Sequence, residues 1–164
     1  MPEVVRVLAL ASMIPVLGCS FQPSSKPREV DMRAIEIAAH GHYVAAINSN
    51  DVDRLMSDLT DDIVYQSPGA PEVVGKTAVK TWVSSYFAAY RTKWQKTSIG
   101  FTVSGDWAFE RYTYKSTDTD KKTGAVTTDV GKGINIFRRG ADGKWRVAID
   151  GWSSDRPSGL ATLK

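Results

Sequence analysis

The chain has 164 residues, of which 42% are hydrophobic and 24% are charged, with one cysteine and a formal net charge of +3. This length and composition are typical of one soluble globular domain and leave little room for a second independent fold. The single cysteine, Cys19, excludes an internal disulfide framework and cysteine-based zinc clusters. The 21 basic and 18 acidic residues are spread along the chain, so no nucleic-acid-binding surface is expected.

The beginning of the chain has the layout of an export signal. Arg6 precedes an almost uncharged apolar run over residues 7–17, which is too short to span a bilayer as a mature helix. Val16-Leu17-Gly18-Cys19 resembles the bacterial lipobox, in which cleavage before the cysteine leaves a diacylglycerol on its thiol. The resemblance implies that residues 1–18 are a signal peptide. It also implies an exported lipoprotein, anchored to a membrane on the periplasmic or cell-surface side through the lipid on Cys19.

Residues 19–30 are then the lipidated cysteine and a flexible tether, because the segment holds Pro23 and Pro27 and has no apolar periodicity. Two other interpretations stay open. The apolar stretch can be an ordinary N-terminal strand or helix with a buried cysteine. Alternatively, translation can begin at Met13 or Met32, which would give a cytosolic protein.

One domain is expected over residues 31–164, and it opens with three helices. From Asp31 the apolar residues recur at three-to-four spacing until Asn48-Ser49-Asn50 ends the pattern. Asn50 is expected to cap a second, short helix whose apolar stripe runs from Val52 to Leu59, with Asp61 and Asp62 in the turn after it. The third helix is predicted over residues 76–90.

Five strands are predicted, and four of them come after the helices. They are expected at residues 63–67, 96–104, 107–115, 130–139 and 144–153. Gly105-Asp106 and the segment 140–143 are hairpin signals, and the polar residues 116–128 are expected to form a long hairpin end. Helices followed by a run of antiparallel strands favour an α+β fold in which the helices cover one face of a curved sheet.

Two stretches of the chain resemble ketosteroid isomerase and SnoaL-like proteins. The first runs over residues 43–53 and continues through 59–62, Ser67-Pro68 and 75–79. The second runs from Phe137 through 142–147 to Asp155 and is similar to an uncharacterised secreted branch of the same superfamily. The resemblance covers nearly the whole domain. It implies the cone-shaped fold of nuclear transport factor 2, with three N-terminal helices packed on a curved, mostly antiparallel sheet around a pocket.

The resemblance also implies site residues. In the isomerases, a helix tyrosine and a protonated aspartic acid on a strand donate hydrogen bonds to a developing oxyanion, while another aspartate moves the proton. Tyr43 matches the tyrosine, and Asn135 matches the strand donor with an amide that can still donate. Ser67 stands where the proton-moving aspartate is expected. Because a hydroxyl is not a general base near neutral pH without an activator, whether the chain is an enzyme stays open.

Asp150 is the candidate for the missing base. Strand alternation places Ala148, Asp150 and Trp152 on one face and Val147 and Ile149 on the other. If the first face lines the pocket, Asp150 lies beside Trp152 in a partly apolar site that suits a general base. The alternative is a hydrogen-bonded or solvated aspartate at the rim of the sheet.

Aromatic residues complete the candidate site. Tyr43 is expected either to contact the ligand or to be an aromatic residue of the hydrophobic core. The other aromatic candidates, which are also common in protein cores, are Tyr65, Trp82, Tyr86, Tyr112 and Trp152. No cofactor is expected. No metal is expected either, because His40 and His42 lie two positions apart and so do not share a helix face.

Three functions remain as hypotheses. The first, favoured by the serine at position 67, is a membrane-tethered exported domain that binds a small, partly apolar molecule through Tyr43 and Asn135. The second is an isomerase, dehydratase or cyclase that uses Asp150 as its base. The third is a homodimerisation or protein-interaction module that uses the outer face of the sheet.

Overall fold

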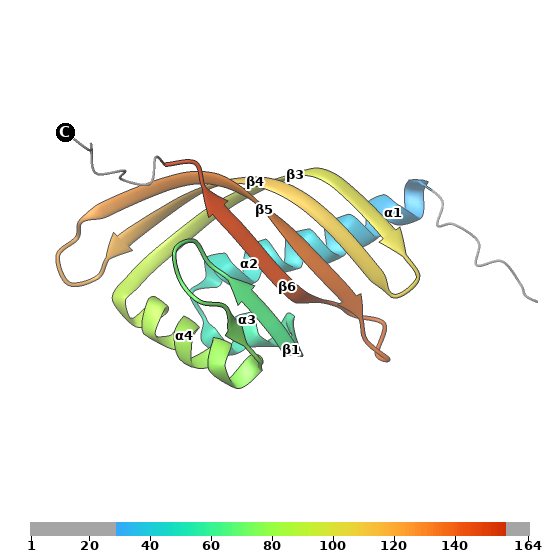
Figure 1. The fold of residues 1–164 in the computed structure, drawn as a ribbon, viewed down its shortest axis with the longest axis horizontal. Helices are drawn as coiled ribbons and strands as arrows, with labels where there is room; N and C mark the ends of the chain where they lie inside the picture. Colours follow the sequence, from blue (N-terminus) through green and yellow to red (C-terminus); the bar gives the residue numbers. More distant parts are fainter. Residues whose placement is uncertain (1–28, 157–164) are drawn as a thin grey trace, which may run out of the picture.

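The computed structural model describes residues 29–156, and the predicted signal peptide, Cys19 and most of the tether lie outside this range. A long helical run comes first (Figure 1). It consists of α1 (Glu29–Glu36), a π-helical segment (Ile37–Gly41) and α2 (His42–Ser49). The other helices are α3 (Val52–Ser57) and α4 (Lys76–Ala89). No helix among these is long and apolar enough to cross a membrane.

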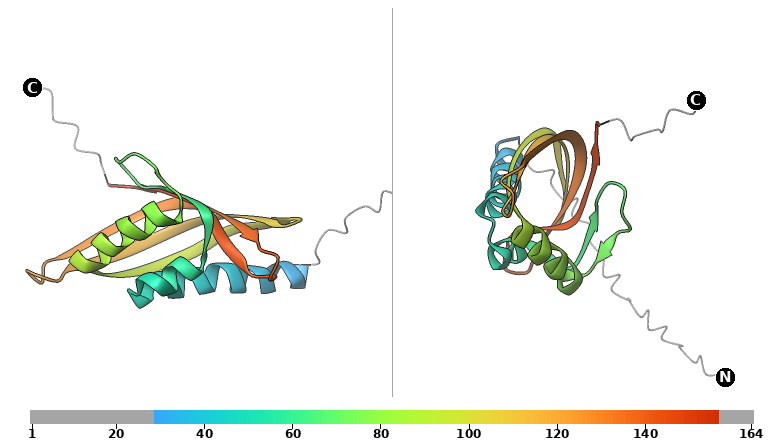
Figure 2. Two further views of the ribbon diagram at one scale, coloured as in Figure 1. Left: turned by 90° about the horizontal axis from the view of Figure 1, so that it is seen from below. Right: turned by 90° about the vertical axis from the view of Figure 1, so that its left-hand side faces the viewer.

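The described strands form one curved sheet in the order β2-β1-β6-β5-β4-β3. Their bounds are β1 (Leu59–Gln66), β2 (Val73–Val74), β3 (Tyr90–Ser104), β4 (Trp107–Asp120), β5 (Val126–Arg139) and β6 (Trp145–Ser154). Only β1 and β6 pair in parallel, and the other neighbours are antiparallel. The helices lie against the concave side of the sheet (Figure 2). The predicted α+β class with helices on a curved, mostly antiparallel sheet is therefore confirmed.

Most of the strands are longer than the sequence predicts, although β6 has the predicted length, and the short β2 is not among the predicted strands. The segment predicted as a long hairpin end is mostly strand, because β4 continues to Asp120 and β5 starts at Val126. Ser116 and Asp118 belong to β4 and line a cavity on the inner side of the sheet, so their polarity does not mark a solvated loop. β3 likewise starts at Tyr90, directly after α4, and pairs with β4 over its whole length.

Two asparagines fix the end of α2 against the edge strand β3. Asn48 accepts from the backbone N–H of Trp94 at 2.7 Å and donates to its carbonyl at 2.9 Å. Asn50 makes the same pair of bonds to Thr92, at 2.7 and 3.0 Å. The prediction that Asn50 caps the next helix is wrong: with φ +54° it ends α2, and Asp51 caps α3 by accepting from the N–H of Arg54.

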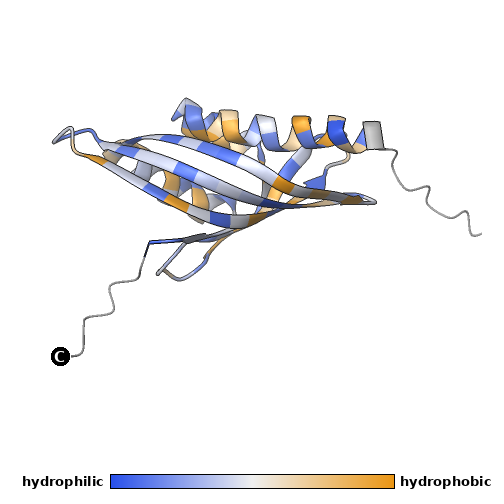
Figure 3. Ribbon diagram, turned by 90° about the horizontal axis from the view of Figure 1, so that it is seen from above, coloured by the Kyte–Doolittle hydropathy of each residue, from blue (hydrophilic) through white to orange (hydrophobic). Residues whose placement is uncertain are grey.

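The hydrophobic core lies between the helices and the inner face of the sheet. Its fully buried members include Leu59, Ile63, Val79, Phe137 and Val147. Hydrophobic and hydrophilic residues alternate along much of the sheet, as half-buried strands require (Figure 3). The outer face nevertheless exposes several large apolar side chains, among them Ile99, Phe109 and Ile134.

The register of β6 changes at a β-bulge. Ile136 pairs with Ile149 while Phe137 pairs with Val147, so Ala148 is an extra residue on β6. The bulge turns Val147 into the core, which corrects the expectation that it shares the outer face with Ile149. Alternation resumes after the bulge and directs Asp150 inward, where it is 5% exposed.

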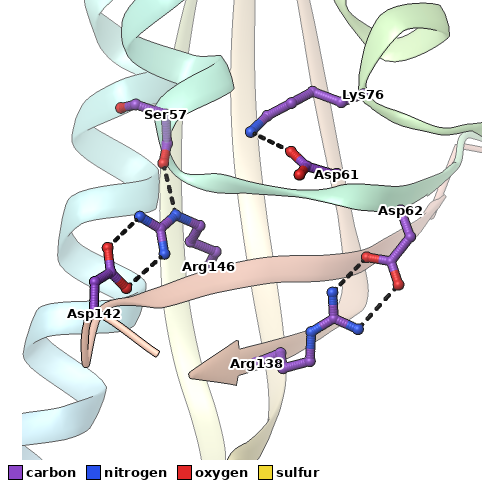
Figure 4. A network of polar contacts seen from close by, with 7 residues as sticks. All are labelled: Ser57, Asp61, Asp62, Lys76, Arg138, Asp142 and Arg146. Carbon is purple, nitrogen blue, oxygen red and sulfur yellow. Dashed lines mark hydrogen bonds and ion pairs between the residues drawn. The ribbon is translucent and has the colours of Figure 1, made fainter. Parts of the chain in front are cut away.

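Exposed ion pairs join β1 to β5 and to the start of α4 on the surface (Figure 4). Asp62 accepts two hydrogen bonds from Arg138 of β5, at 2.6 and 2.9 Å, and Lys76 at the start of α4 donates to Asp61 at 3.1 Å. Both aspartates lie in β1 and not in the predicted turn, because α3 already ends at Ser57. Exposed pairs of this kind contribute little to stability.

Candidate functional site

A cavity of about 440 Å³ lies between the helices and the inner face of the sheet. Its lining is mainly aromatic and aliphatic, with three serines and three aspartates at separate points. The aromatic lining residues are Tyr43, Tyr65, Trp82, Tyr86, Phe87, Trp94 and Trp152, and the aspartates are Asp118, Asp129 and Asp150. A largely apolar cavity with a few polar groups is the usual form of a small-molecule site.

The aromatic rings contact one another around the cavity. Trp152 lies edge-on to Tyr65, with the ring centroids 5.9 Å apart, and to Trp94 at 6.2 Å. Trp82 stacks on Tyr86 at 5.4 Å and also lies edge-on to Tyr65. Because these rings come from α4, β1, β3 and β6, helices and sheet together form one aromatic wall.

A layer of polar residues crosses the inner face of the sheet beside this wall. The register pairs Glu110 of β4 with Asn135 of β5, Asn135 with Asp150 of β6, and Asp150 with Tyr65 of β1. All four side chains are buried. Buried polar groups must find partners or destabilise the fold, so the contacts within this layer determine how the interior is arranged.

Asp150 is the centre of the layer. Tyr43 of α2 donates to its Oδ2 at 2.6 Å, and Tyr112 of β4 donates to its Oδ1 at 2.8 Å. Tyr43 and Tyr65 also share a hydrogen bond at 3.1 Å. Both carboxylate oxygens are therefore engaged by tyrosine hydroxyls, one from the helical layer and one from the sheet.

Lys96 of β3 supplies a positive charge inside the protein. Its Nζ donates to Asn135 Oδ1 at 2.8 Å and lies 3.7 Å from Asp150 Oδ2. The ammonium also lies 3.6 Å from the ring centroid of Tyr112 and 4.8 Å from that of Tyr43, both within cation–π range. Burial lowers the pKa of Lys96, while the charges of Asp150 and Glu110 oppose that shift.

The tyrosines around Asp150 keep their protons more strongly than free tyrosine. Burial raises the pKa of Tyr43 well above its ordinary value, and the negative charge of Asp150 raises it further. The same two causes, in the same order, raise the pKa values of Tyr65 and Tyr112. These hydroxyls are therefore hydrogen-bond donors and not bases over the physiological pH range.

Two glycines of β5 make room for the tyrosines of β4. A Cβ atom at Gly133 would lie 2.4 Å from the hydroxyl of Tyr112, and one at Gly131 would lie 2.7 Å from that of Tyr114. The side chain of each tyrosine thus lies over the neighbouring strand β5 at the position of a glycine. For Tyr112 this crossing permits the hydrogen bond to Asp150.

A second buried acid lies at the other end of the layer. Glu110 is 1% exposed, and its Oε1 lies 2.5 Å from Nδ1 of His40, which belongs to the π-helical segment. Neither residue lines the cavity. Within residues 29–156, no group of three or more His, Cys, Asp or Glu side chains is placed to hold a metal ion.

The structure brings most of the predicted site residues together. Seven of them line the cavity: Tyr43, Tyr65, Ser67, Trp82, Tyr86, Asp150 and Trp152. Asn135 and Tyr112 lie behind this lining, where they contact Lys96 and Asp150, and a ligand-binding role for these two stays a prediction. The amide nitrogen of Asn135 has no hydrogen-bond partner in the described part of the chain.

Sequence reasoning missed four charged residues of this region, namely Lys96, Glu110, Asp118 and Asp129. Strand alternation offered a signal for two of them, because Lys96 shares a face with Trp94, and Glu110 shares one with Tyr112. The two aspartates had no such signal, since Asp118 lies in the polar segment that was expected to be a hairpin end and Asp129 follows it directly.

Replacing Tyr43 with phenylalanine tests the hydrogen bond to Asp150. A raised tyrosine pKa gives stability that is complete below the unfolded value near pH 10 and is lost as the pH rises above it. Tyr43→Phe has no proton to lose, so its unfolding free energy should fall less steeply above pH 10, by up to about 1.4 kcal/mol per pH unit. Near pH 7 the variant should be about 1–3 kcal/mol less stable than wild type, because Asp150 loses a donor.

Urea denaturation between pH 7 and pH 11.5 measures both effects. Tyr90→Phe is the matched control, because the Tyr90 hydroxyl makes no hydrogen bond within residues 29–156. Identical pH slopes for wild type and Tyr43→Phe would contradict the assignment.

Comparisons with known proteins agree with this architecture. The family model of the SnoaL-like domain matches residues 41–148. A ketosteroid isomerase-like protein from Erwinia carotovora atroseptica is 30% identical, with a TM-score of 0.70, over 79% of this chain and 100% of that chain. A search among curated proteins finds no match.

Two further solved structures share the fold at lower identity. A conserved protein from Planctomyces limnophilus is 24% identical, with a TM-score of 0.67, over 74% of this chain and 98% of that chain. A nuclear transport factor 2-like superfamily protein from Salmonella enterica serovar Typhimurium is 14% identical, with a TM-score of 0.63, over 80% and 99% of the two chains. Since the family model spans 108 of the 164 residues, the chain belongs to the SnoaL-like domain family and has the nuclear transport factor 2-like cone fold.

Proposed function

We propose that this domain binds a small, partly apolar molecule in the cavity between its helices and its sheet. The observation that carries the proposal is a cavity of about 440 Å³ whose wall consists largely of aromatic rings and includes the buried carboxylate of Asp150. Cavities of roughly 300–1,000 Å³ with this composition hold small organic molecules. The rings provide contact area for an apolar body, and the polar groups orient the ligand.

The bonding of Asp150 favours binding over catalysis. Its two oxygens already accept from Tyr43 and Tyr112, and Lys96 lies close to one of them. A general base must present an accessible lone pair to the proton that it removes, and tyrosine hydroxyls occupy one lone pair on each oxygen of Asp150. Ser67, the other candidate position, carries only a hydroxyl.

An enzyme of the isomerase, dehydratase or cyclase kind is the second candidate. It is supported by the position of Asp150 and Tyr43, a carboxylate and a hydroxyl donor 2.6 Å apart on the wall of one cavity. The similar protein from Erwinia carotovora is a ketosteroid isomerase-like protein, which also supports an enzymatic function. In this function Asp150 takes a proton from the substrate, and a tyrosine donates to the oxyanion that forms.

The domain is proposed to act outside the cytoplasm, held to a membrane by a lipid on Cys19. Support comes from the order of features in the sequence, where an apolar run and Val16-Leu17-Gly18-Cys19 precede a proline-containing segment. A homodimer through the outer sheet face is also compatible with the exposed Ile99, Phe109 and Ile134. That dimer stays a prediction.

Filling the cavity tests the binding function. Ser116 lies on the inner face of β4 and lines the cavity, so Ser116→Phe places a phenyl group in its volume. We expect isothermal titration with 4-phenylbutanol to give one saturable site on wild type and at least about tenfold weaker binding to Ser116→Phe. Thr113→Phe adds the same ring to the exposed face of β4 and should bind like wild type. Equal affinity of wild type and Ser116→Phe would exclude the cavity as the site.

Proton exchange tests the enzyme alternative without a known substrate. In D2O, NMR follows the exchange of the α-protons of 4-phenyl-2-butanone in the presence of wild type or Asp150→Asn. Because Asp150 is engaged by two tyrosines, we expect both proteins to leave the buffer rate unchanged. Acceleration by wild type that is lost in Asp150→Asn would instead establish Asp150 as a base.

Cys19→Ala tests the membrane tether. Wild type expressed in a bacterium should fractionate with membranes and incorporate labelled fatty acid, because several acyl chains on one residue anchor a protein firmly. The variant has no thiol to modify and should appear in the soluble fraction without label. Equal membrane recovery of the two proteins would rule out the lipoprotein assignment.

A further inference from the structure

The ionisable groups that line the cavity all have the same sign. Three aspartates contribute to its surface, and none of the described lining residues is a lysine, arginine or histidine. Trp82, Trp94 and Trp152 also line the cavity, and the faces of tryptophan rings attract cations. Carboxylates and ring faces therefore favour a positive charge at the same place and disfavour an anion.

Two of the three carboxylates already have a basic partner. Lys96 lies 3.7 Å from Asp150, and Arg156 lies 3.4 Å from Asp129. Asp129 also accepts from Ser154 and Tyr114, at 2.6 and 2.7 Å. The charges of these two aspartates are thus largely offset within the protein.

Asp118 differs because it has hydrogen-bond donors but no positive partner. Tyr86 and Thr92 both donate to its Oδ1, at 2.6 and 2.5 Å, which leaves Oδ2 without a donor in the described part of the chain. No basic side chain among residues 29–156 lies within 4 Å of it. The ammonium of nearby Lys121 is bound to the carbonyl of Phe87 at 2.5 Å. A hydrogen-bonded carboxylate therefore lines the cavity without a basic partner within 4 Å in the described part of the chain.

The aromatic wall continues directly from Asp118. Tyr86, which donates to Asp118, stacks on Trp82, and Trp82 lies 6.4 Å from Trp152 between ring centroids. Trp94 closes the other side at 6.2 Å from Trp152. An ammonium group beside Asp118 would thus lie next to rings that can contact both the charge and an attached apolar body.

We propose that the ligand of this cavity is an organic cation, an amine with an apolar or aromatic body. Its ammonium group binds Asp118, and its body packs against Trp82, Trp94 and Trp152. This inference rests on the proposed ligand-binding function and specifies the charge of the ligand. Neutral molecules of the same shape bind more weakly, and carboxylates bind most weakly of all.

Three probes of similar size that differ in charge test the inference. Isothermal titration at pH 7 and low salt compares 4-phenylbutylamine, 4-phenylbutanol and 4-phenylbutyrate on the wild-type protein. The amine should bind about tenfold more tightly than the alcohol, and the acid should bind more weakly than the alcohol. Raising the salt concentration should reduce the preference for the amine, because screening weakens attraction between partly exposed charges.

Asp118→Asn then tests whether Asp118 is the residue that binds the ammonium group. The amide keeps an oxygen that can accept from Tyr86 and Thr92, so the fold should persist, and circular dichroism checks that it does. Affinity for the amine should fall about five- to tenfold, while affinity for the alcohol should stay within about twofold. Asp61→Asn, an exposed aspartate outside the cavity lining, is the matched control and should change neither affinity.

The possible failures are distinguishable. If the alcohol binds wild type as tightly as the amine, and Ser116→Phe weakens it, the cavity is a binding site but the preference for cations is wrong. If none of the three probes binds wild type, both the ligand-binding function and the cationic ligand are contradicted. The comparison of the three probes uses only the wild-type protein, so it tests the inference even if Asp118→Asn does not fold.

Discussion

The compensation of one buried negative charge constrains how this protein is assembled. Asp150 is 5% exposed, and a carboxylate in that position is tolerated only if donors and a positive charge surround it. Tyr43 supplies a donor from α2, Tyr112 supplies one from β4, and Lys96 brings the charge from β3. Removing the charged partner of a buried ion pair typically costs about 3–5 kcal/mol, and losing one hydroxyl donor costs less, so these contacts together hold the helical layer on the sheet.

The same arrangement separates the interior into two parts. On one side of the polar layer, Phe137, Val147 and their neighbours fill the space as an ordinary core. On the other side the aromatic residues leave a cavity, which has Asp150 in its wall and Asp118 and Asp129 among its other polar groups. Asp150, which two tyrosines and a lysine contact, is suited to stabilising the fold, whereas Asp118, which has no basic partner among the described residues, is suited to binding a positively charged group. This division of roles supports the proposed ligand-binding function.

The sequence was sufficient for the fold class and for the inward direction of Asp150, because periodicity and hairpin signals depend on local chemistry. It misplaced Val147, since a one-residue bulge leaves no local mark, and it read the cavity-lining Asp118 as part of a solvated hairpin end. Lys96 was missed for a related reason. A lysine on a strand is usually solvent-exposed, so the face that it shares with Trp94 was a weak signal, and the contact with Asn135 shows that it is buried.

A crystal structure of the protein soaked with 4-(4-bromophenyl)butylamine would show directly where an organic cation binds, because bromine can be located by its anomalous scattering. We expect one bromine peak among Trp82, Trp94 and Trp152, with the amine nitrogen within hydrogen-bond distance of Asp118 and the hydrogen bond between Tyr43 and Asp150 intact. A cavity filled by side chains, or a probe found only at other places on the molecule, would contradict this expectation.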